Sequence, residues 1–297
     1  MPTVTWNPAG GSAKSFSTTA EYLPTSAASE NNERHAMTSN RTIRHGRDGS
    51  VLTLTLDDPS TRNALGDDTL DQLLAELEAA RLDESVRVVV LRSADRKVFS
   101  SGGNLKDFTD DRPVIEKYAG LDRFPRLYRA LGGLGKPIVC AAEGDVLAGA
   151  FGLALGCDFI VAREGVRFGC PEINVGVFPF MISALIYRSV PRSKANELMM
   201  TGELITAEEA QRMDIVNRVA PRERFEEELS RLTGRLATRS PLLLRMGKDA
   251  LDATRDMPFD DALGYLRSQL ALAFATEDVR EGVAALKERR EPQWQSR

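Results

Sequence analysis

The 297-residue sequence predicts an α/β fold. Short apolar runs, such as residues 86–91 and 138–142, have the length and composition of buried strands. Amphipathic segments, such as residues 67–77, carry leucines at helical spacing. Glycine-rich turns join strand to helix, most clearly within residues 143–152. This recurrence of strand, tight turn and helix indicates strands and helices that alternate along one chain.

The remaining elements follow in order after an N-terminal extension. Residues 1–40 are rich in Ser, Thr, Ala and Asn, without periodicity, and are predicted to be disordered, with Met37 as a candidate start. A core at residues 41–220 and a helical region at 221–297 are expected to follow. The predicted strands are residues 51–57, 86–91, 138–142, 158–162 and 215–219. Three predicted helices are recognised by how they begin: one is capped by Asp67 or Asp68, one starts after residue 148, and one opens with a capping box at Thr206 and Glu209. The other predicted helices are 121–131, 181–190, 221–237, 241–254, and 258–290 with a break near Thr276.

Composition excludes several classes of function. The formal net charge is −4 and no basic stripe occurs, which argues against nucleic-acid binding. No apolar run reaches the roughly 18 residues of a membrane span. Three cysteines without a C-x-x-C pair indicate a reduced, cytoplasmic protein. Since the two histidines are His35 and His45, acid–base chemistry in the body of the chain falls mainly to carboxylates, and a His/Cys metal site there is excluded.

Three ordered motifs carry the chemistry. The first, F-S-S-G-G-N-L-K at residues 99–106, follows a predicted strand. The second, K-P-I-V-C-A-A-E-G-D-V-L-A-G-A-F-G-L-A-L-G-C-D at residues 136–158, runs from a strand into a helix that opens with small residues. Such a helix start presents unpaired backbone N–H groups, which suit an oxygen that becomes negatively charged. The third, F-G-C-P-E-I-N-V-G, spans residues 168–176.

Together these motifs resemble the crotonase superfamily of enoyl-CoA hydratases and isomerases, from about Thr42 to the C-terminus. The resemblance implies a spiral of ββα units with a C-terminal helical region that forms a trimer, and a homotrimer or a dimer of trimers. It implies an acyl-CoA thioester substrate and no separate cofactor, because coenzyme A is part of that substrate. Asn104 stands where the family pattern has Asp.

The resemblance also assigns catalytic roles. The backbone N–H groups of Gly103 and Gly149 are expected to stabilise the thioester enolate, and Glu172 is expected to be the acid–base. Hydratases of the family carry a second glutamate three residues after the oxyanion glycine, where this sequence has Gly152. A single carboxylate can still move a proton between two carbons, and burial near aromatic residues would raise its pKa as needed. Glu143 and Asp145, at the turn before the second glycine, could supply a substitute acid, but a solvated turn is the favoured interpretation.

Substrate-binding residues are implied in the same way. The loop of Arg62 and Ala64 is expected to line coenzyme A, together with Ser101 and Lys106 of the first motif and Lys287 from a neighbouring subunit. Phe178 is expected to line the acyl pocket, and Phe274 is predicted to be a core residue.

The sequence favours double-bond isomerisation of an enoyl-CoA, and the family-level activity is enoyl-CoA hydration. The alternatives are a CoA-ester-binding protein with little catalysis, or another reaction of the superfamily such as thioester hydrolysis or decarboxylation. A dinucleotide-binding enzyme is excluded, because the first strand–helix turn lacks the G-x-G-x-x-G pattern.

Overall fold

The computed structural model describes residues 41–104 and 111–297. The predicted disordered extension, including Met37, lies outside the described residues. Residues Arg41–Arg297 form one compact unit. A division of this unit near residue 220 stays a prediction.

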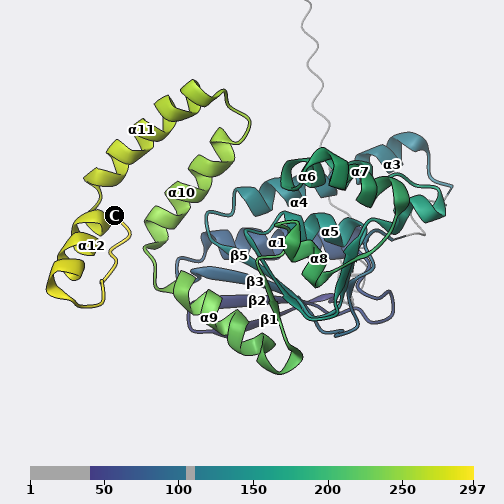
Figure 1. Ribbon diagram of the computed structural model, residues 1–297, viewed down its shortest axis with the longest axis horizontal. Helices are drawn as coiled ribbons and strands as arrows, with labels where there is room; N and C mark the ends of the chain where they lie inside the picture. Colours follow the sequence, from purple (N-terminus) through teal and green to yellow (C-terminus); the bar gives the residue numbers. More distant parts are fainter. Residues whose placement is uncertain (1–40, 105–110) are drawn as a thin grey trace, which may run out of the picture. The chain divides into compact units, whose positions relative to one another are not determined.

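Two sheets form the centre of this unit (Figure 1). The larger has the order β1-β2-β3-β5-β7-β10, with β1 antiparallel to β2 and the other neighbours parallel. The smaller has the order β4-β6-β8-β9, with β9 antiparallel to β8. The strands are β1 Ile43–Asp48, β2 Val51–Leu56, β3 Val88–Ser93, β4 Val98–Ser100, β5 Ile138–Ala142, β6 Asp145–Leu147, β7 Phe159–Arg163, β8 Arg167–Gly169, β9 Ile205–Thr206 and β10 Arg218–Ala220.

A repeated unit explains this order. Each of the pairs β3–β4, β5–β6 and β7–β8 places its first strand in the larger sheet and its second in the smaller sheet. Helices follow each pair before the chain returns to the larger sheet. The predicted spiral of ββα units is therefore confirmed. The helices are α1 Asp67–Leu82, α3 Val114–Gly120, α4 Arg123–Gly132, α5 Gly149–Leu155, η1 Pro171–Val175, α6 Phe180–Ser189, α7 Arg192–Thr201, α8 Ala207–Arg212, η2 Arg222–Arg224, α9 Phe225–Ala237, α10 Pro241–Thr254, α11 Phe259–Ala275 and α12 Glu277–Glu288.

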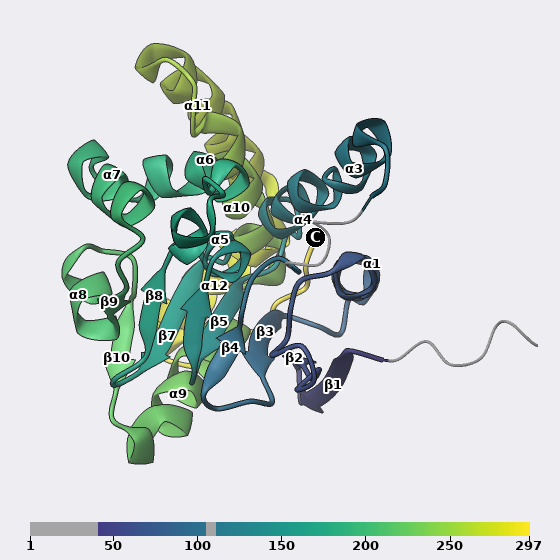
Figure 2. The same ribbon diagram turned by 90° about the vertical axis from the view of Figure 1, so that its right-hand side faces the viewer.

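Apolar packing covers both faces of the larger sheet. Its strands β3, β5 and β7 lie between α5 on one side and α9 on the other (Figure 2). The α9 side is a smaller cluster that joins Val88, Val139 and Val161 to Phe225 and Leu229. Strands buried on both faces are near-continuous apolar runs, which is why β3 and β5 were recognisable from sequence.

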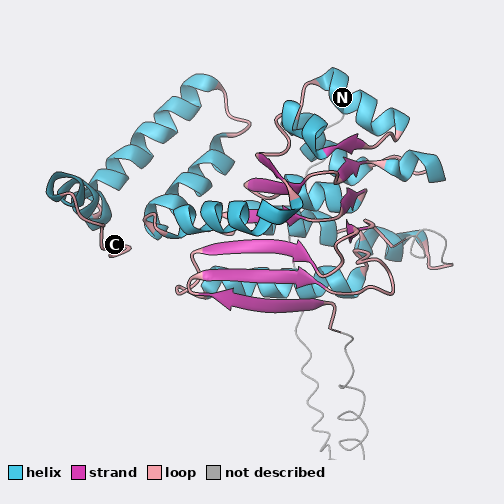
Figure 3. Cartoon of the chain, turned by 60° about the horizontal axis from the view of Figure 1, so that its bottom comes forward, coloured by secondary structure: helices cyan, strands magenta, loops and turns pink. Residues whose placement is uncertain are grey.

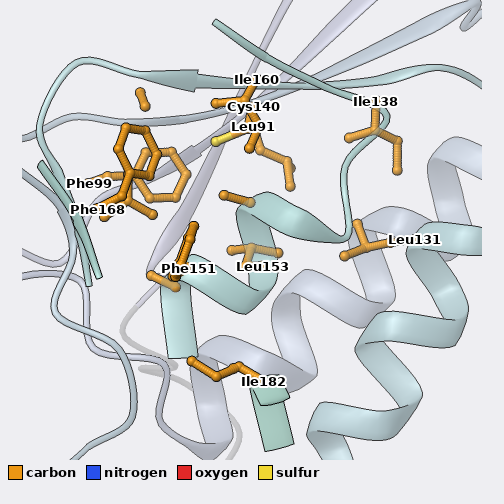
Figure 4. Packing of buried hydrophobic residues seen from close by; sticks show 14 of the residues in the cluster. Leu91, Phe99, Leu131, Ile138, Cys140, Phe151, Leu153, Ile160, Phe168 and Ile182 are labelled. Carbon is orange, nitrogen blue, oxygen red and sulfur yellow. The ribbon is translucent and has the colours of Figure 1, made fainter. Parts of the chain in front are cut away.

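The main core holds the elements that carry the motifs. Phe99 of β4, Phe151 of α5 and Phe168 of β8 are all fully buried in it, with the ring centroids of Phe151 and Phe168 6.0 Å apart (Figure 4). Packing these three rings together costs no polar desolvation and fixes α5 against the ends of two strands of the smaller sheet.

The C-terminal helices α11 and α12 lie apart from both sheets (Figure 3). Helix α10, which precedes these two helices, contacts the core through Lys248. The Lys248 ammonium group lies 2.6 Å from the Asp158 carboxylate and 3.2 Å from the carbonyl oxygen of Lys136. Asp158 also accepts a hydrogen bond from the N–H of Ile138 at 2.8 Å, which fixes the start of β5. Among the described residues, no helix is both long and apolar enough to cross a bilayer.

The structure corrects several element predictions. Helix α1 begins after Gly66, so Asp67 and Asp68 occupy its first turn rather than its cap, where carboxylates still complement the helix dipole. The predicted turn at 143–145 instead leads directly into β6. Helices α3 and α7 were not predicted. The capping box at Thr206 and Glu209 is confirmed.

Candidate active site

The three motifs meet at one edge of the smaller sheet. Strands β4, β6 and β8 are parallel neighbours, so their carboxyl ends lie side by side. The chain leaves these ends toward Gly103, Gly149 and Glu172 respectively. In α/β proteins this edge is where ligands usually bind.

The two glycine turns are in close contact. Gly102 has φ +86°, and a Cβ built on it would meet the Ala148 side chain and lie 2.8 Å from the backbone N of Gly149. A Cβ built on Gly149 would lie 3.4 Å from the backbone N of Gly103 and 3.3 Å from the ring of Phe124. The backbones of the two predicted N–H donors therefore lie next to each other, which a single oxygen between them requires.

Strained backbone precedes the second donor. Ala148 has φ +54° and ψ −131°, a conformation that costs an alanine on the order of 1–3 kcal/mol. The N–H of Ala148 donates to the carbonyl oxygen of Gly169 at 2.9 Å, which holds the turn against the end of β8. Strain of this kind is retained where the backbone direction matters, and here it directs the start of α5.

The loop at residues 59–65 lies against the first glycine turn. The N–H of Ser101 donates to the carbonyl oxygen of Arg62 at 3.0 Å, and the N–H of Leu65 donates to that of Gly102 at 2.7 Å. The Ser101 hydroxyl donates to the carbonyl oxygen of Thr61 at 3.2 Å. Arg62 is exposed here and Ala64 is buried beside it. The structure thus brings together Arg62, Ala64 and Ser101.

Asn63 holds this loop, a role that the sequence analysis missed. Its side chain is buried and donates to the Ser93 hydroxyl at 2.8 Å and to the carbonyl oxygen of Phe99 at 3.1 Å. Its Oδ1 accepts from the N–H of Asp58 at 2.7 Å. The backbone has φ +57°, which asparagine tolerates better than most residues. The available signal was an asparagine within a turn of polar residues.

Glu172 is a carboxylate in an apolar environment. It is the second residue of η1, which begins at Pro171 shortly after β8 ends, and within the described chain its buried Oε2 has no hydrogen-bond partner. Burial raises the pKa of Glu172 to about 7, partly offset by a hydrogen bond from its own backbone N–H. A carboxyl group with this pKa can both accept and donate a proton near neutral pH.

Tyr128 takes the space that Gly152 leaves. A Cβ built on Gly152 would lie 2.5 Å from the Tyr128 hydroxyl oxygen and would also clash with Ile182 of α6. The Tyr128 hydroxyl is buried and, among the described residues, has no hydrogen-bond partner. Burial and then the charge of Glu172 raise the Tyr128 pKa above its usual value, so the two groups lie within electrostatic reach. Tyr128 shares a face of α4 with Phe124, four residues earlier, and this spacing was a signal that the sequence analysis did not use.

Comparison with known proteins decides the family. The family model described as enoyl-CoA hydratase/isomerase matches residues 46–297. The chain belongs to this family. It is 36% identical over 252 residues to 2,3-dehydroadipyl-CoA hydratase of Escherichia coli K12, covering 84% of this chain and 97% of that protein. It is 32% identical over 256 residues to carnitinyl-CoA dehydratase of the same strain, covering 84% and 97%.

Solved structures agree with this family assignment. An enoyl-CoA hydratase from Mycobacterium smegmatis superposes with a TM-score of 0.82 at 28% identity, covering 86% of this chain and 99% of that one. An enoyl-CoA hydratase subunit from Geobacillus kaustophilus gives 0.80 at 35% identity with the same coverage. The crotonase fold predicted from the three motifs is therefore confirmed.

Other predicted residues of this family member lie in different settings. Phe178 is half-buried, and its ring centroid lies 5.2 Å from that of the exposed Phe180. Lys106 lies outside the described residues. Lys287 is exposed near the end of α12, and Figure 1 shows α12 well away from α5, so this chain does not bring it to its own site.

Two interpretations outside the site were wrong. Glu143 is buried rather than solvated, because it pairs with Arg92 and lies 3.5 Å from the Arg96 guanidinium. Asp145 is likewise shielded by its ion pair with Arg167 at 2.5 Å. Phe274 is 62% exposed on α11 and is not a core residue of this chain. The two acids are thus held in ion pairs and are poor candidates for a second proton donor.

Proposed function

We propose that this protein isomerises the double bond of an enoyl-CoA thioester, with Glu172 as the proton carrier. The observation that supports this most directly is the position of Glu172, which follows the strand edge that also leads to Gly103 and Gly149 and whose Oε2 is buried without a partner among the described residues. This burial raises the pKa of Glu172 to about 7. The two relatives named above act on CoA esters by name, which supports a CoA thioester as the substrate class.

The proposed reaction needs one carboxylate. Glu172 takes a proton from C2 of a 3-enoyl thioester, and the electrons of the broken C–H bond delocalise onto the thioester oxygen. The N–H groups of Gly103 and Gly149 donate to that oxygen as its charge develops, and one such donor typically contributes roughly 10²–10³ in rate. Protonated Glu172 then returns the proton to C4 as the double bond forms between C2 and C3. Atoms and charge balance without any co-reactant.

Coenzyme A is proposed to bind along the loop of Arg62 and Ala64, beside Ser101, with Lys106 near its phosphates. Phe178 is proposed to line the acyl pocket. No separate cofactor is needed for this chemistry.

A second copy of the chain is proposed to cover α11. Every residue of this helix is exposed or half-buried, and its large apolar side chains include Phe259, Leu263, Leu270, Leu272 and Phe274. Apolar surface on this scale is typical of a subunit interface. A homotrimer or a dimer of trimers would bury it and could bring Lys287 to a neighbouring site. Light scattering should therefore give a mass of three or six chains, and a monomeric mass would contradict this assembly.

The isomerase rate should rise with pH, because the reaction begins with ionised Glu172. We expect kcat/KM to increase through an apparent pKa near 7 and then level off. Initial rates on a 3-enoyl-CoA between about pH 5 and pH 9 measure this. His45, the histidine in the described residues, pairs with Glu76 on the surface, so His45→Gln should leave the profile unchanged. A profile that is flat across this range, or that shifts in His45→Gln, would contradict the assignment.

A paired assay tests the function. The full-length protein is given trans-3-enoyl-CoA and trans-2-enoyl-CoA of several chain lengths. The products are separated by chromatography and their masses are measured by mass spectrometry. We expect the 3-enoyl ester to become the 2-enoyl ester without a change of mass. Thermal stabilisation by both esters without any turnover would favour the CoA-ester-binding alternative. Release of free coenzyme A would favour hydrolysis.

A further inference from the structure

A cleft with a volume of about 610 Å³ lies where the C-terminal helices leave the core. It is bordered by the end of α1, the loop before β5, the start of α10 and the C-terminal tail. We call it the junction cleft. Small-molecule sites in proteins typically have volumes of about 300–1,000 Å³, so the junction cleft is large enough for a ligand.

The junction cleft is separate from the candidate active site. Residues 86–87 and 136–137 line it directly before β3 and β5 begin. Gly103, Gly149 and Glu172 instead follow the carboxyl ends of β4, β6 and β8. Among the described residues, none that is proposed above for catalysis or for coenzyme A binding lines the cleft. A ligand in the junction cleft would therefore occupy a second site.

Positive charge predominates in the junction cleft. Its two acidic residues, Glu84 and Asp249, are both exposed. They are outnumbered by the five basic residues that line the cleft, which are Arg81, Arg87, Lys136, Arg239 and Arg245. Arg81 pairs with Glu78, and the other four form no ion pair with a carboxylate in the described part of the chain. Since the whole chain has a formal net charge of −4, this local excess does not follow from the composition.

Two of these cations are fixed on the core side of the cleft by neutral groups. The Lys136 ammonium group donates to the carbonyl oxygens of Ala80 and Asp83, the second at 2.6 Å. Arg87 donates to the carbonyl oxygen of Ala237 at 3.1 Å. Burial lowers the pKa of Lys136, because a shielded ammonium group is costly to keep charged. An anion in the cleft would offset this cost.

The other two cations, Arg239 and Arg245, are available to a ligand. Both are exposed, and neither guanidinium group has a hydrogen bond or an ion pair within the described residues. Gly135, with φ +70°, leaves room for the stem of Arg245. A Cβ built on Gly135 would lie 2.8 Å from Cγ and 3.0 Å from Cδ of Arg245. This contact holds Arg245 over the loop before β5, next to Lys136. Guanidinium and ammonium groups together are the usual binding groups for phosphate in proteins.

We propose that the junction cleft binds a polyphosphate group, carried by a nucleoside triphosphate or present as inorganic tripolyphosphate. Arg239 and Arg245 donate to the phosphate oxygens from the start of the C-terminal helices. Arg87 and Lys136 supply positive charge from the core. The bound ligand thus connects the two parts of the chain and should raise the temperature at which the protein unfolds.

Calorimetric titration of the full-length protein with ATP and, separately, with tripolyphosphate tests this proposal. We expect one site per chain, with an affinity that falls as the salt concentration rises. Binding of ATP alone would show that the nucleoside contributes, and similar binding of both would show that the phosphate chain is sufficient. Either result supports the proposal, and binding of neither compound overturns it.

Arginine substitutions locate the site. Arg245→Gln and Arg239→Gln should each weaken binding about tenfold or more, the usual effect of losing one charge-assisted hydrogen bond. Arg255→Gln is the matched control, because Arg255 is an exposed arginine directly after α10 that does not line the cleft. It should bind as the unmodified protein does. Unfolding temperatures of the ligand-free variants show whether each keeps its fold.

Arg62→Gln separates this site from the one proposed for coenzyme A, whose nucleotide part resembles ATP. This variant should keep its affinity for ATP and tripolyphosphate. The proposal is overturned if Arg62→Gln loses binding while Arg239→Gln and Arg245→Gln retain it, or if Arg255→Gln weakens binding as much as they do. Because binding is measured without turnover, a protein that fails to isomerise an enoyl-CoA would refute the function proposed above and leave this test unaffected.

Discussion

Replacement of Glu172 by glutamine should lower the isomerase kcat by roughly 10²–10⁴-fold, the range expected for a general acid–base. Glutamine has the same size and can still occupy the apolar site, but it cannot accept a proton from C2 at neutral pH. Binding of the acyl-CoA should change little, because Glu172 acts on the acyl chain and the proposed coenzyme A contacts lie on the loop of Arg62 and Ser101. Steady-state kinetics and calorimetric titration with an acyl-CoA measure the two effects.

Glu164→Gln provides the control, since this glutamate is exposed in the turn between β7 and β8. It should retain full activity. A Glu172→Gln variant with undiminished turnover would remove Glu172 from the mechanism, and a variant that loses acyl-CoA binding as well would make its role structural.

The same variant should be more stable than the unmodified protein at high pH. The pKa of Glu172 is raised from an ordinary value near 4.5 to about 7 in the folded state. Its favourable contribution is therefore fully present below about pH 4.5 and is lost as the pH rises through about 7. Above that pH the buried charge destabilises the fold by an amount on the order of 2 kcal/mol. Urea unfolding at about pH 5 and pH 8 should show the advantage of Glu172→Gln growing with pH.

Much of the fold could be predicted because its signals are local. A strand buried on both faces, such as β5, must be apolar throughout. A helix such as α8 leaves backbone N–H groups unpaired at its start, and here the side chains of Thr206 and Glu209 accept hydrogen bonds from each other's backbone N–H groups. The strand β6 was missed for the opposite reason. It has three residues and alternates in burial, so its pairing with β4 and β8 comes from tertiary contacts and not from its composition.

Prediction of the site from the sequence had the same limit, because residues that approach each other only through tertiary contacts leave no local signal. Glycines and a glutamate in ordered motifs were sufficient to predict that Gly103, Gly149 and Glu172 belong together, because parallel strands place their carboxyl ends at one edge. Tyr128 could not be assigned in this way, since its helix approaches Gly152 only after folding. The burial of Glu143 was not predictable because its ion partner Arg92 lies on β3, 51 positions earlier in the sequence.

Replacement of Gly102 by alanine should have the largest effect on stability and should also abolish activity. Gly102 has φ +86°, and the new methyl group would collide with the Ala148 side chain and lie 2.8 Å from the N of Gly149 and 2.9 Å from the carbonyl oxygen of Leu147. Two of these three obstacles are backbone atoms that cannot turn aside. Overpacking and the unfavourable φ together should destabilise the fold by about 2–4 kcal/mol. The chain can relieve the contact only by moving the first glycine turn away from the second, which separates the N–H groups of Gly103 and Gly149.

Gly165→Ala distinguishes the contact from the backbone strain. Gly165 has φ +80°, nearly that of Gly102, but a Cβ built on it has no heavy atom within 4 Å. This control should cost about 1 kcal/mol through the unfavourable φ alone and leave turnover intact. Urea unfolding and isomerase assays on both variants then separate the cost of the steric contact from the cost of the unfavourable φ angle.

Equal destabilisation of the two variants, or an active Gly102→Ala protein, would show that the close approach of the two turns is not required. Loss of activity in Gly102→Ala beyond what its unfolded fraction explains would instead support an oxygen-binding site formed jointly by the two turns.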